Sequence, residues 1–173
     1  MRAARAAVGV VAAALVVAAC GSGADEATRL VDREQVEGLL KQRQTERNPR
    51  LAVESASCPD GVAARQGDAF ECTVVIEGVQ APFTVTVAEV LGQQVRYDLR
   101  ARVAIVDVAR VVDFLRSRLE PPWRTAGIDC GAGKVRLVEV GGALDCTVSD
   151  GTRTRSIKAV VEDREGTINL QEA

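Results

Sequence analysis

Five cysteines and the absence of histidine limit the chemistry open to this 173-residue chain. Cys20 follows an apolar amino-terminal run, and the other four fall into two closely spaced pairs, Cys58 with Cys72 and Cys130 with Cys146. Nucleophilic triads need a base, usually histidine, to activate serine or cysteine, so that class of enzyme is excluded. Four cysteines allow three disulfide pairings. A metal site is the competing interpretation, although the chain has no histidine and no CxxC motif.

An internal duplication bears on how the cysteines pair. Residues 67–74 read GDAFECTV and residues 141–148 read GGALDCTV, at a constant offset of 74 with five identities. Upstream, Cys58 aligns with Cys130 at an offset of 72. Duplication favours one disulfide within each copy, Cys58–Cys72 and Cys130–Cys146. A bridge that closes a loop of about 15 residues stabilises a fold by about 3 kcal/mol, which matters for repeats with small cores.

Each copy is predicted to begin with a helix that follows an aspartate cap, Asp32 or Asp107, and ends before a proline, Pro49 or Pro121. Apolar and polar residues then alternate, which predicts strands. The expected fold class is α+β, with two tandem repeats that each pack one helix on an antiparallel sheet of about four strands and carry one disulfide. The expected strands are 70–77, 83–87, 93–105, 135–140, 143–149, 155–161 and 167–170.

The strand expected at residues 93–105 leads into the Asp107 cap without a linker, so we expect the two repeats to pack closely. The composition suits such a folded domain, with 47% hydrophobic and 27% charged residues. Lysine and arginine number 22 against 24 aspartate and glutamate, a net charge of −2. The basic surface typical of nucleic-acid-binding proteins is missing, so no nucleic-acid partner is expected.

The amino terminus has the layout of a secretory signal peptide, with two arginines followed by a 14-residue uncharged apolar run. Such a run is too short to span a bilayer, which needs about 20 residues. Residues 15–20, LVVAAC, resemble the bacterial lipobox. The resemblance implies cleavage after residue 19 and fatty acyl chains, such as palmitate, on Cys20. An ordinary secretory signal or an uncleaved interfacial helix is the alternative.

These boundaries give a signal peptide at 1–19, a lipidated cysteine and flexible tether at 20–29, and repeats at 30–104 and 105–173. The first copy contains a further pattern of residues: Cys58-Pro59, Gly67, Phe70, Cys72, Thr73, Val74 and Gly92. Together with the strand at 83–87 and the preceding lipobox and short helix, this pattern resembles the actinobacterial domain-of-unknown-function family 4333, in two tandem copies. The resemblance implies an exported protein or lipoprotein and no particular activity. The plan also looks like the secreted β-lactamase-inhibitor protein fold, in architecture alone.

Four side chains are candidates for contact with a partner. Trp123, the only tryptophan, follows two prolines and could anchor a partner, although it aligns with Leu51, which favours a packing role. Arg96, Arg100 and Arg102 line the polar face of the strand at 93–105 and could meet anionic lipid headgroups or acidic wall polymers. A solvated strand face is the alternative for these arginines.

Two further patterns suggest chemistry and have simpler interpretations. Glu71 and Asp145 precede the second cysteine of each copy, and their equivalent positions indicate a solvated strand face rather than an acid–base pair. Residues 131–134, GAGK, are similar to a phosphate-binding loop but lack its first glycine and its Ser/Thr, so they predict a turn between strands.

We therefore expect an exported protein that is lipid-anchored at the outer face of the cytoplasmic membrane. It would have no catalytic residues, metal or cofactor, and would bind an envelope protein or polymer near the membrane. One alternative is a carrier of a small apolar ligand or lipid, which would need a cavity between helix and sheet. A second alternative is a carboxylate-dependent hydrolase, which would need two acidic groups that converge in a cleft.

Overall fold

Both predicted helices form, and each follows its predicted aspartate cap. Helix α1 (Arg33–Arg47) follows Asp32, and helix α2 (Val108–Arg118) follows Asp107. Each aspartate carboxylate accepts a hydrogen bond from a backbone amide of the first turn, at 3.1 and 3.2 Å. These bonds satisfy amide donors that the start of a helix leaves unpaired. As expected, both helices end before a proline, and α1 is about one turn longer than α2.

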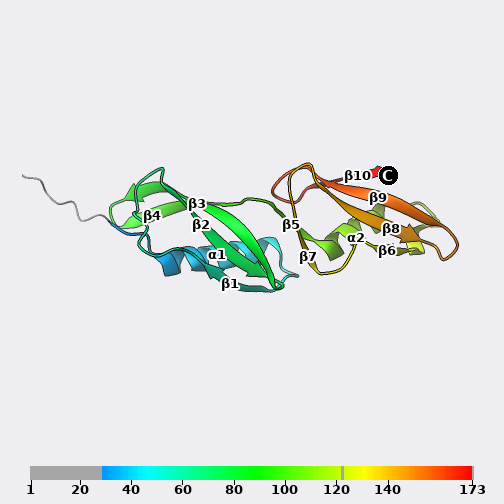
Figure 1. Cartoon of the computed structure of the whole chain (residues 1–173), viewed down its shortest axis with the longest axis horizontal. Helices are drawn as coiled ribbons and strands as arrows, with labels where there is room; N and C mark the ends of the chain where they lie inside the picture. The colour runs from blue at the N-terminus through cyan, green and yellow to red at the C-terminus, as the bar shows by residue number, and fades with distance from the viewer. Residues whose placement is uncertain (1–28, 122, 173) are drawn as a thin grey trace, which may run out of the picture.

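The computed structural model describes residues 29–121 and 123–172. It is an α+β fold whose two lobes lie end to end (Figure 1). In the first lobe, α1 packs on a four-stranded antiparallel sheet with the order β1-β2-β3-β4. Its buried face holds alternate residues of the strands, and α1 covers that face with two fully buried side chains, Val36 and Leu40. The strands are β1 (Val53–Ser57), β2 (Ala69–Ile76), β3 (Val79–Leu91) and β4 (Gln94–Ala101).

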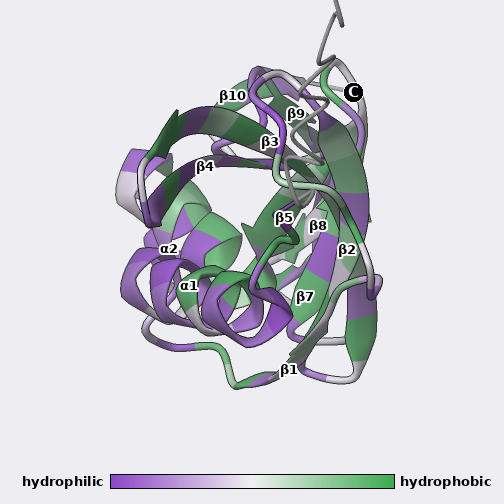
Figure 2. Cartoon of the chain, turned by 90° about the vertical axis from the view of Figure 1, so that its left-hand side faces the viewer, coloured by the Kyte–Doolittle hydropathy of each residue, from purple (hydrophilic) through white to green (hydrophobic). Residues whose placement is uncertain are grey.

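Helix α1 lies nearer to β1 than to β4 (Figure 2). The tight β2–β3 connection holds Glu77 and Gly78, which both adopt positive φ angles of 49° and 75°. That conformation suits the turn of a two-residue hairpin, because its twist matches that of the flanking strands. The hairpin sets the β2–β3 register and places Cys72, Val74 and Ile76 on the buried face together.

The second lobe also joins one helix to a four-stranded antiparallel sheet, here in the order β10-β9-β8-β6. A short 3-10 helix, η1 (Trp123–Thr125), connects α2 to the first strand of this sheet. The strand at residues 127–129 was not predicted, because three residues that include a glycine give almost no alternating pattern. The strands are β6 (Gly127–Asp129), β8 (Ala143–Ser149), β9 (Thr154–Val161) and β10 (Ile168–Glu172).

The single strand predicted at residues 93–105 is wrong. Strand β4 ends at Ala101, the chain bends at residues 102 and 103, and a separate strand β5 (Ala104–Asp107) begins. Strand β5 pairs with β7 (Val135–Val138) and with neither large sheet. The strand at 135–140 was expected in the sheet of the second repeat. That prediction is wrong, because β7 pairs only with β5 among the described strands. The alternating apolar pattern of β4 continues to Ile105 because every residue of β5 is buried, so the positions that extend the pattern are apolar as well.

Strand β5 contributes to both hydrophobic cores. Ile105 packs in the core of the first lobe, whereas Ala104 and Val106 pack in the core of the second. Strand β7 divides in the same way, with Val135 in the first core and Val138 against the second. Successive side chains of a strand point to opposite faces, so this small sheet lies between the cores and contacts both.

Ion pairs reinforce the junction at its surface. Arg50, which follows α1, bonds to Asp113 of α2 (2.8 Å) and to the Asp107 cap (3.1 Å). The hydrogen bond to Asp113 and the charge of Asp107 raise the pKa of Arg50. Lys134 pairs with Glu77 across the lobes (3.0 Å). The pKa of Glu77 is lowered, first by the amide of Ala52 and then by Lys134. The close packing expected of the two halves is therefore present.

Each lobe contains one disulfide. Cys58 bonds to Cys72 in the first lobe, and Cys130 bonds to Cys146 in the second. These are the pairs that the duplication favours, and both sit on the buried side of a central strand, β2 or β8. No helix within residues 29–121 and 123–172 has the length and apolar character needed to cross a membrane. Cys20, the predicted signal peptide and most of the predicted tether lie outside the described residues.

Candidate ligand-binding groove at the end of the second lobe

Trp123 is buried at the end of the second lobe. Its side chain is 6% exposed and packs with Ala126 and Val148. The η1 turn positions it, because the Trp123 amide donates to the Glu120 carbonyl (2.9 Å) and the Trp123 carbonyl accepts from Ala126 (3.0 Å). Leu51, its counterpart in the first lobe, is equally buried. The burial agrees with a packing role for the indole.

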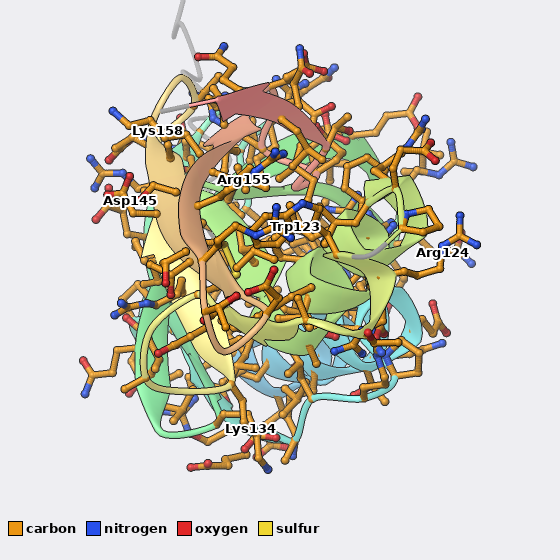
Figure 3. All side chains as sticks on the ribbon, turned by 90° about the vertical axis from the view of Figure 1, so that its right-hand side faces the viewer. Trp123, Arg124, Lys134, Asp145, Arg155 and Lys158 are labelled. Atoms are coloured by element: carbon orange, nitrogen blue, oxygen red, sulfur yellow. A yellow bond between two sulfur atoms is a disulfide. The ribbon has the colours of Figure 1, made fainter. Side chains whose placement is uncertain are left out.

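Two arginines from β9 and the preceding turn cover the indole ring. The guanidinium carbon of Arg153 lies 4.9 Å from a ring centroid, and that of Arg155 lies 4.6 Å away. Figure 3 shows Trp123 and Arg155 side by side, in a view onto the end of the second lobe. A cation over an indole face is attracted to the negative face of the ring. Trp123 thus orients both guanidinium groups.

The two guanidinium groups differ in their other partners. Arg153 bonds to Asp150 through Nη2 (2.7 Å) and Nε (3.0 Å). Arg155 has no carboxylate within ion-pair distance among the described residues. A cation–π contact holds the guanidinium at the ring without using its N–H donors. Arg155 is therefore a pre-oriented cation whose donors are free to bind an anion.

Beside Arg155 lies a groove of about 520 Å³, which we call the arginine–tryptophan groove. Arg118 forms part of its wall and stacks on Phe114 at 5.2 Å. Glu120 is the one carboxylate in the lining. The groove is lined by Arg118, Leu119, Glu120, Trp123, Arg155, Ser156 and Ile157.

Positive charge gathers around this groove, although the whole chain carries −2. Arg153 lies over Trp123, and Arg124 donates through Nε to the Leu119 carbonyl (3.4 Å). With Arg118 and Arg155, these give four cations against two carboxylates, those of Glu120 and Asp150. A cationic concavity attracts anions and pairs well with planar carboxylate or phosphate groups. The arrangement can therefore bind an anionic group.

Asp150 organises the turn that delivers Arg153 to the indole. Its carboxylate accepts from the backbone amides of Thr152 (3.0 Å) and Arg153 (2.8 Å) and from the Thr152 hydroxyl (2.8 Å). The backbone bond from Arg153, followed by those from Thr152, holds the pKa of Asp150 well below its ordinary value. The anionic form of Asp150 therefore stabilises this turn.

The three arginines predicted on one strand face lie in the first lobe, apart from Trp123. Arg96 pairs with Glu89 (3.1 Å) and Arg102, just beyond β4, pairs with Glu71 (2.7 Å). Arg100 is exposed and lies opposite Thr84 of β3. The structure thus does not bring the four candidate contact residues together. Arg153 and Arg155 were missed: Arg155 begins the predicted strand at 155–161, but Arg153 lies in the turn before it, and the sequence pattern does not show that both reach Trp123.

The acidic and glycine-rich candidates occupy exposed positions. Glu71 and Asp145 lie on the exposed faces of two different sheets, and the first of them faces Arg102 rather than a second carboxylate. Residues 131–134 form the connection between β6 and β7, and Lys134 bonds to Glu77. Within the described part of the chain, no group of three or more His, Cys, Asp or Glu side chains could hold a metal ion.

Residues 14–92 match the model of a family described as Domain of unknown function (DUF4333). The match begins in the apolar amino-terminal run, spans α1 and strands β1 to β3, and supports the family resemblance for that part of the chain. Strand β4 and the second lobe lie beyond the matched residues. No curated protein and no solved structure matches the chain.

Asp150→Asn tests how the anionic turn contributes to stability. A carboxylate whose pKa is lowered by folding stabilises the native state above its unfolded pKa of about 3.9, and this contribution disappears as the pH falls toward the folded pKa. The wild type should therefore exceed Asp150→Asn in urea stability at about pH 6, and the difference should shrink between about pH 4 and pH 2.

The matched control is Asp145→Asn, which removes an exposed carboxylate of the same lobe that accepts no hydrogen bond in the described residues. It should show little difference from the wild type at any pH in that range. A stability difference for Asp150→Asn that stays constant across the range would contradict the assigned role.

Proposed function

We propose that this protein is an exported lipoprotein, anchored through Cys20, that acts as a non-catalytic binding module at the outer face of the cytoplasmic membrane. The signal-like residues 1–19 and the lipobox-like residues 15–20 support export and lipidation. The family match also includes the segment that contains Cys20. Two acyl chains would make the attachment stable, whereas one chain binds membranes only marginally.

The observation that carries the binding assignment is the Arg155 guanidinium, stacked on Trp123 and without a carboxylate partner among the described residues. An arginine that is simply exposed to solvent does not need a buried ring to hold its guanidinium group in one position. Here a buried indole orients the cation at the wall of a groove that Arg118 also lines. This favours an anionic partner with several charged groups, such as a phosphate-bearing or carboxylate-bearing envelope polymer.

The position of the groove supports the same assignment. The described chain begins at residue 29 in the first lobe, and the arginine–tryptophan groove lies at the far end of the second lobe (Figures 1 and 3). A protein fastened at its amino terminus would therefore present this groove away from its point of attachment. That geometry favours a polymer or protein of the envelope over the headgroups of the anchoring bilayer.

We also propose that the two lobes are copies produced by duplication. Each has a capped helix, then four antiparallel strands paired in chain order, β1-β2-β3-β4 and β6-β8-β9-β10. In each, the disulfide joins a cysteine before or beside the sheet to the second strand of that series. The sheet formed by β5 and β7 has no counterpart in the first lobe and occupies the junction instead.

Cys20→Ala tests the anchor. Without the thiol, no thioether-linked lipid can form, so the variant should incorporate no labelled fatty acid and should appear in the medium or as a precursor. Ser22→Ala, two residues away, is the matched control and should label like the wild type. Labelled fatty acid that persists in Cys20→Ala would refute lipidation at this residue.

Arg155→Gln tests the groove, with inorganic polyphosphate as the anionic probe and equilibrium binding to the full chain as the measurement. Loss of one charge-assisted contact should weaken binding by about tenfold. Arg118→Gln should act in the same direction, and binding should weaken as salt is added.

Arg100→Gln removes an exposed arginine of the first lobe and should bind like the wild type. Equal losses in Arg100→Gln and Arg155→Gln would reduce the effect to net charge and contradict a specific groove. Tighter binding to anionic vesicles than to polyphosphate would instead place the surface against lipid headgroups, contrary to the proposal.

A further inference from the structure

A second groove runs along the first lobe, between α1 and the last strand of the sheet. Helix α1 packs against β1 and lies farther from β4, the last strand of the sheet (Figure 2). Two hollows of about 390 and 580 Å³ share Arg43 as a lining residue. Leu39 lines the same hollow as Val95, and Arg47 the same hollow as Leu99. The two hollows thus follow α1 and β4 in the same direction, and we call them the helix–edge groove.

This groove contains unsatisfied polar atoms. Gln44 Oε1 and the Tyr97 hydroxyl are buried and lack a hydrogen-bond partner, and they are the two such side-chain atoms in the described residues. Gln44 is 5% exposed and lines one hollow, and Tyr97 is 7% exposed and lines the other. The Tyr97 hydroxyl lies near the backbone of Asp32. Buried polar atoms are rarely left unpaired, so Gln44 Oε1 at the wall of this groove points to a ligand that donates a hydrogen bond to it.

The backbone edge beside the groove is also unpaired. Strand β4 is the last strand of its sheet, and its outer edge pairs with no strand in the described residues. The amide of Arg102 donates to the Pro82 carbonyl. With the β3–β4 register, this bond shows which residues of β4 direct their amides and carbonyls toward β3 and which direct them away. Antiparallel pairing then directs the amides and carbonyls of Tyr97, Leu99 and Ala101 away from β3. Such an edge is a template for another extended chain.

Charge at the carboxyl end of α1 indicates the chemistry of the occupant. Arg43 and Arg47 have no ion-pair partner among the described residues. Of the carboxylates in the lining, Glu46 accepts from the Gln42 amide, Glu89 pairs with Arg96, and Asp98 is exposed. At this end of the groove, the lining therefore holds two unpaired guanidinium groups and one carboxylate, that of Glu46. The excess of positive charge favours a ligand that carries a carboxylate at this position.

We propose that the helix–edge groove binds an extended, carboxylate-bearing peptide segment of a partner protein, which adds to β4 as a fifth strand. One N–H of the peptide pairs with Gln44 Oε1, and its carboxylate meets Arg43 and Arg47. Its apolar side chains fill the hollows beside Leu39, Val95 and Leu99. From Leu39 to Arg47 the helix rises about 12 Å, which matches about four extended residues.

The assignment is independent of the arginine–tryptophan groove. It rests on the buried unpaired Gln44 Oε1, the free strand edge and the two unpaired arginines, all in the first lobe. A peptide donates N–H groups to Gln44 Oε1 and to the β4 carbonyls, whereas an acyl chain has no donor. A second copy of this chain could pair with β4 through backbone hydrogen bonds alone. It would leave Gln44 Oε1 unpaired, unlike the peptide.

The test selects peptides from a displayed library of random dodecapeptides on the full chain. Sequences with alternating apolar residues and an acidic residue or free carboxyl terminus should be enriched. The enriched peptide should bind Gln44→Leu and the Arg43→Gln/Arg47→Gln double variant at least tenfold more weakly. Gln35→Leu, the same change at an exposed position in the first turn of α1, and Arg155→Gln in the other lobe should bind like the wild type.

Hydrogen exchange provides a readout that does not depend on affinity. In the complex, exchange should slow at the outward amides of Tyr97, Leu99 and Ala101, and an N-methylated version of the same peptide should lose binding. Absence of enrichment, or unchanged exchange at those amides, would overturn the proposal. So would displacement of the peptide by a fluorescent fatty acid that binds Gln44→Leu as tightly as the wild type, since the groove would then be a lipid site.

Discussion

The burial of β5 on both of its faces is the constraint on which the rest of the structure depends. Ile105 packs into the first core, and its neighbours Ala104 and Val106 pack into the second. The same strand ends at Asp107, which caps α2 and bonds to Arg50 after α1. Neither core is complete without this strand, so two lobes that each have a helix, a sheet and a disulfide form one structural unit.

That unit holds the two proposed binding surfaces at fixed places. The arginine–tryptophan groove belongs to the second lobe, at the end away from residue 29, and the helix–edge groove belongs to the first lobe. Their chemistry differs in kind. One presents guanidinium groups oriented by an indole, and the other presents unpaired backbone and side-chain donors and acceptors beside an apolar hollow. An anchored protein with this arrangement would hold an anionic polymer and a peptide segment at the same time, with β5 between them.

Much of the fold could be predicted from local patterns in the sequence. The caps at Asp32 and Asp107 located both helices, because an aspartate side chain pairs the first amides of a helix wherever the helix packs. The alternation around Cys72 and Cys146 located the central strands and, with the duplication, the disulfide pairs. The prediction of one strand at 93–105 was wrong because Ile105 continues the alternating pattern although it belongs to a separate strand, β5. A hydrophobic period does not show in which sheet an apolar residue lies.

The sites were less predictable than the fold. Burial of Trp123 followed from its alignment with Leu51, but the cations that cover it come from a turn distant in sequence. The helix–edge groove depends on where α1 sits across the sheet, which is a matter of tertiary packing that residue patterns do not encode. The unpaired state of Gln44 likewise emerges only when all of its neighbours are placed.

The role of β5 is tested most directly by urea unfolding of Ile105→Ala with two probes. The single tyrosine, Tyr97, reports on the first lobe, and the single tryptophan, Trp123, reports on the second. Truncating a buried isoleucine should lower stability by about 2–4 kcal/mol, and both probes should shift together to one lower midpoint. Val140→Ala, at a half-exposed position, should leave both unchanged. A shift in the Tyr97 signal with the Trp123 midpoint unmoved would contradict the shared strand and show two independent lobes.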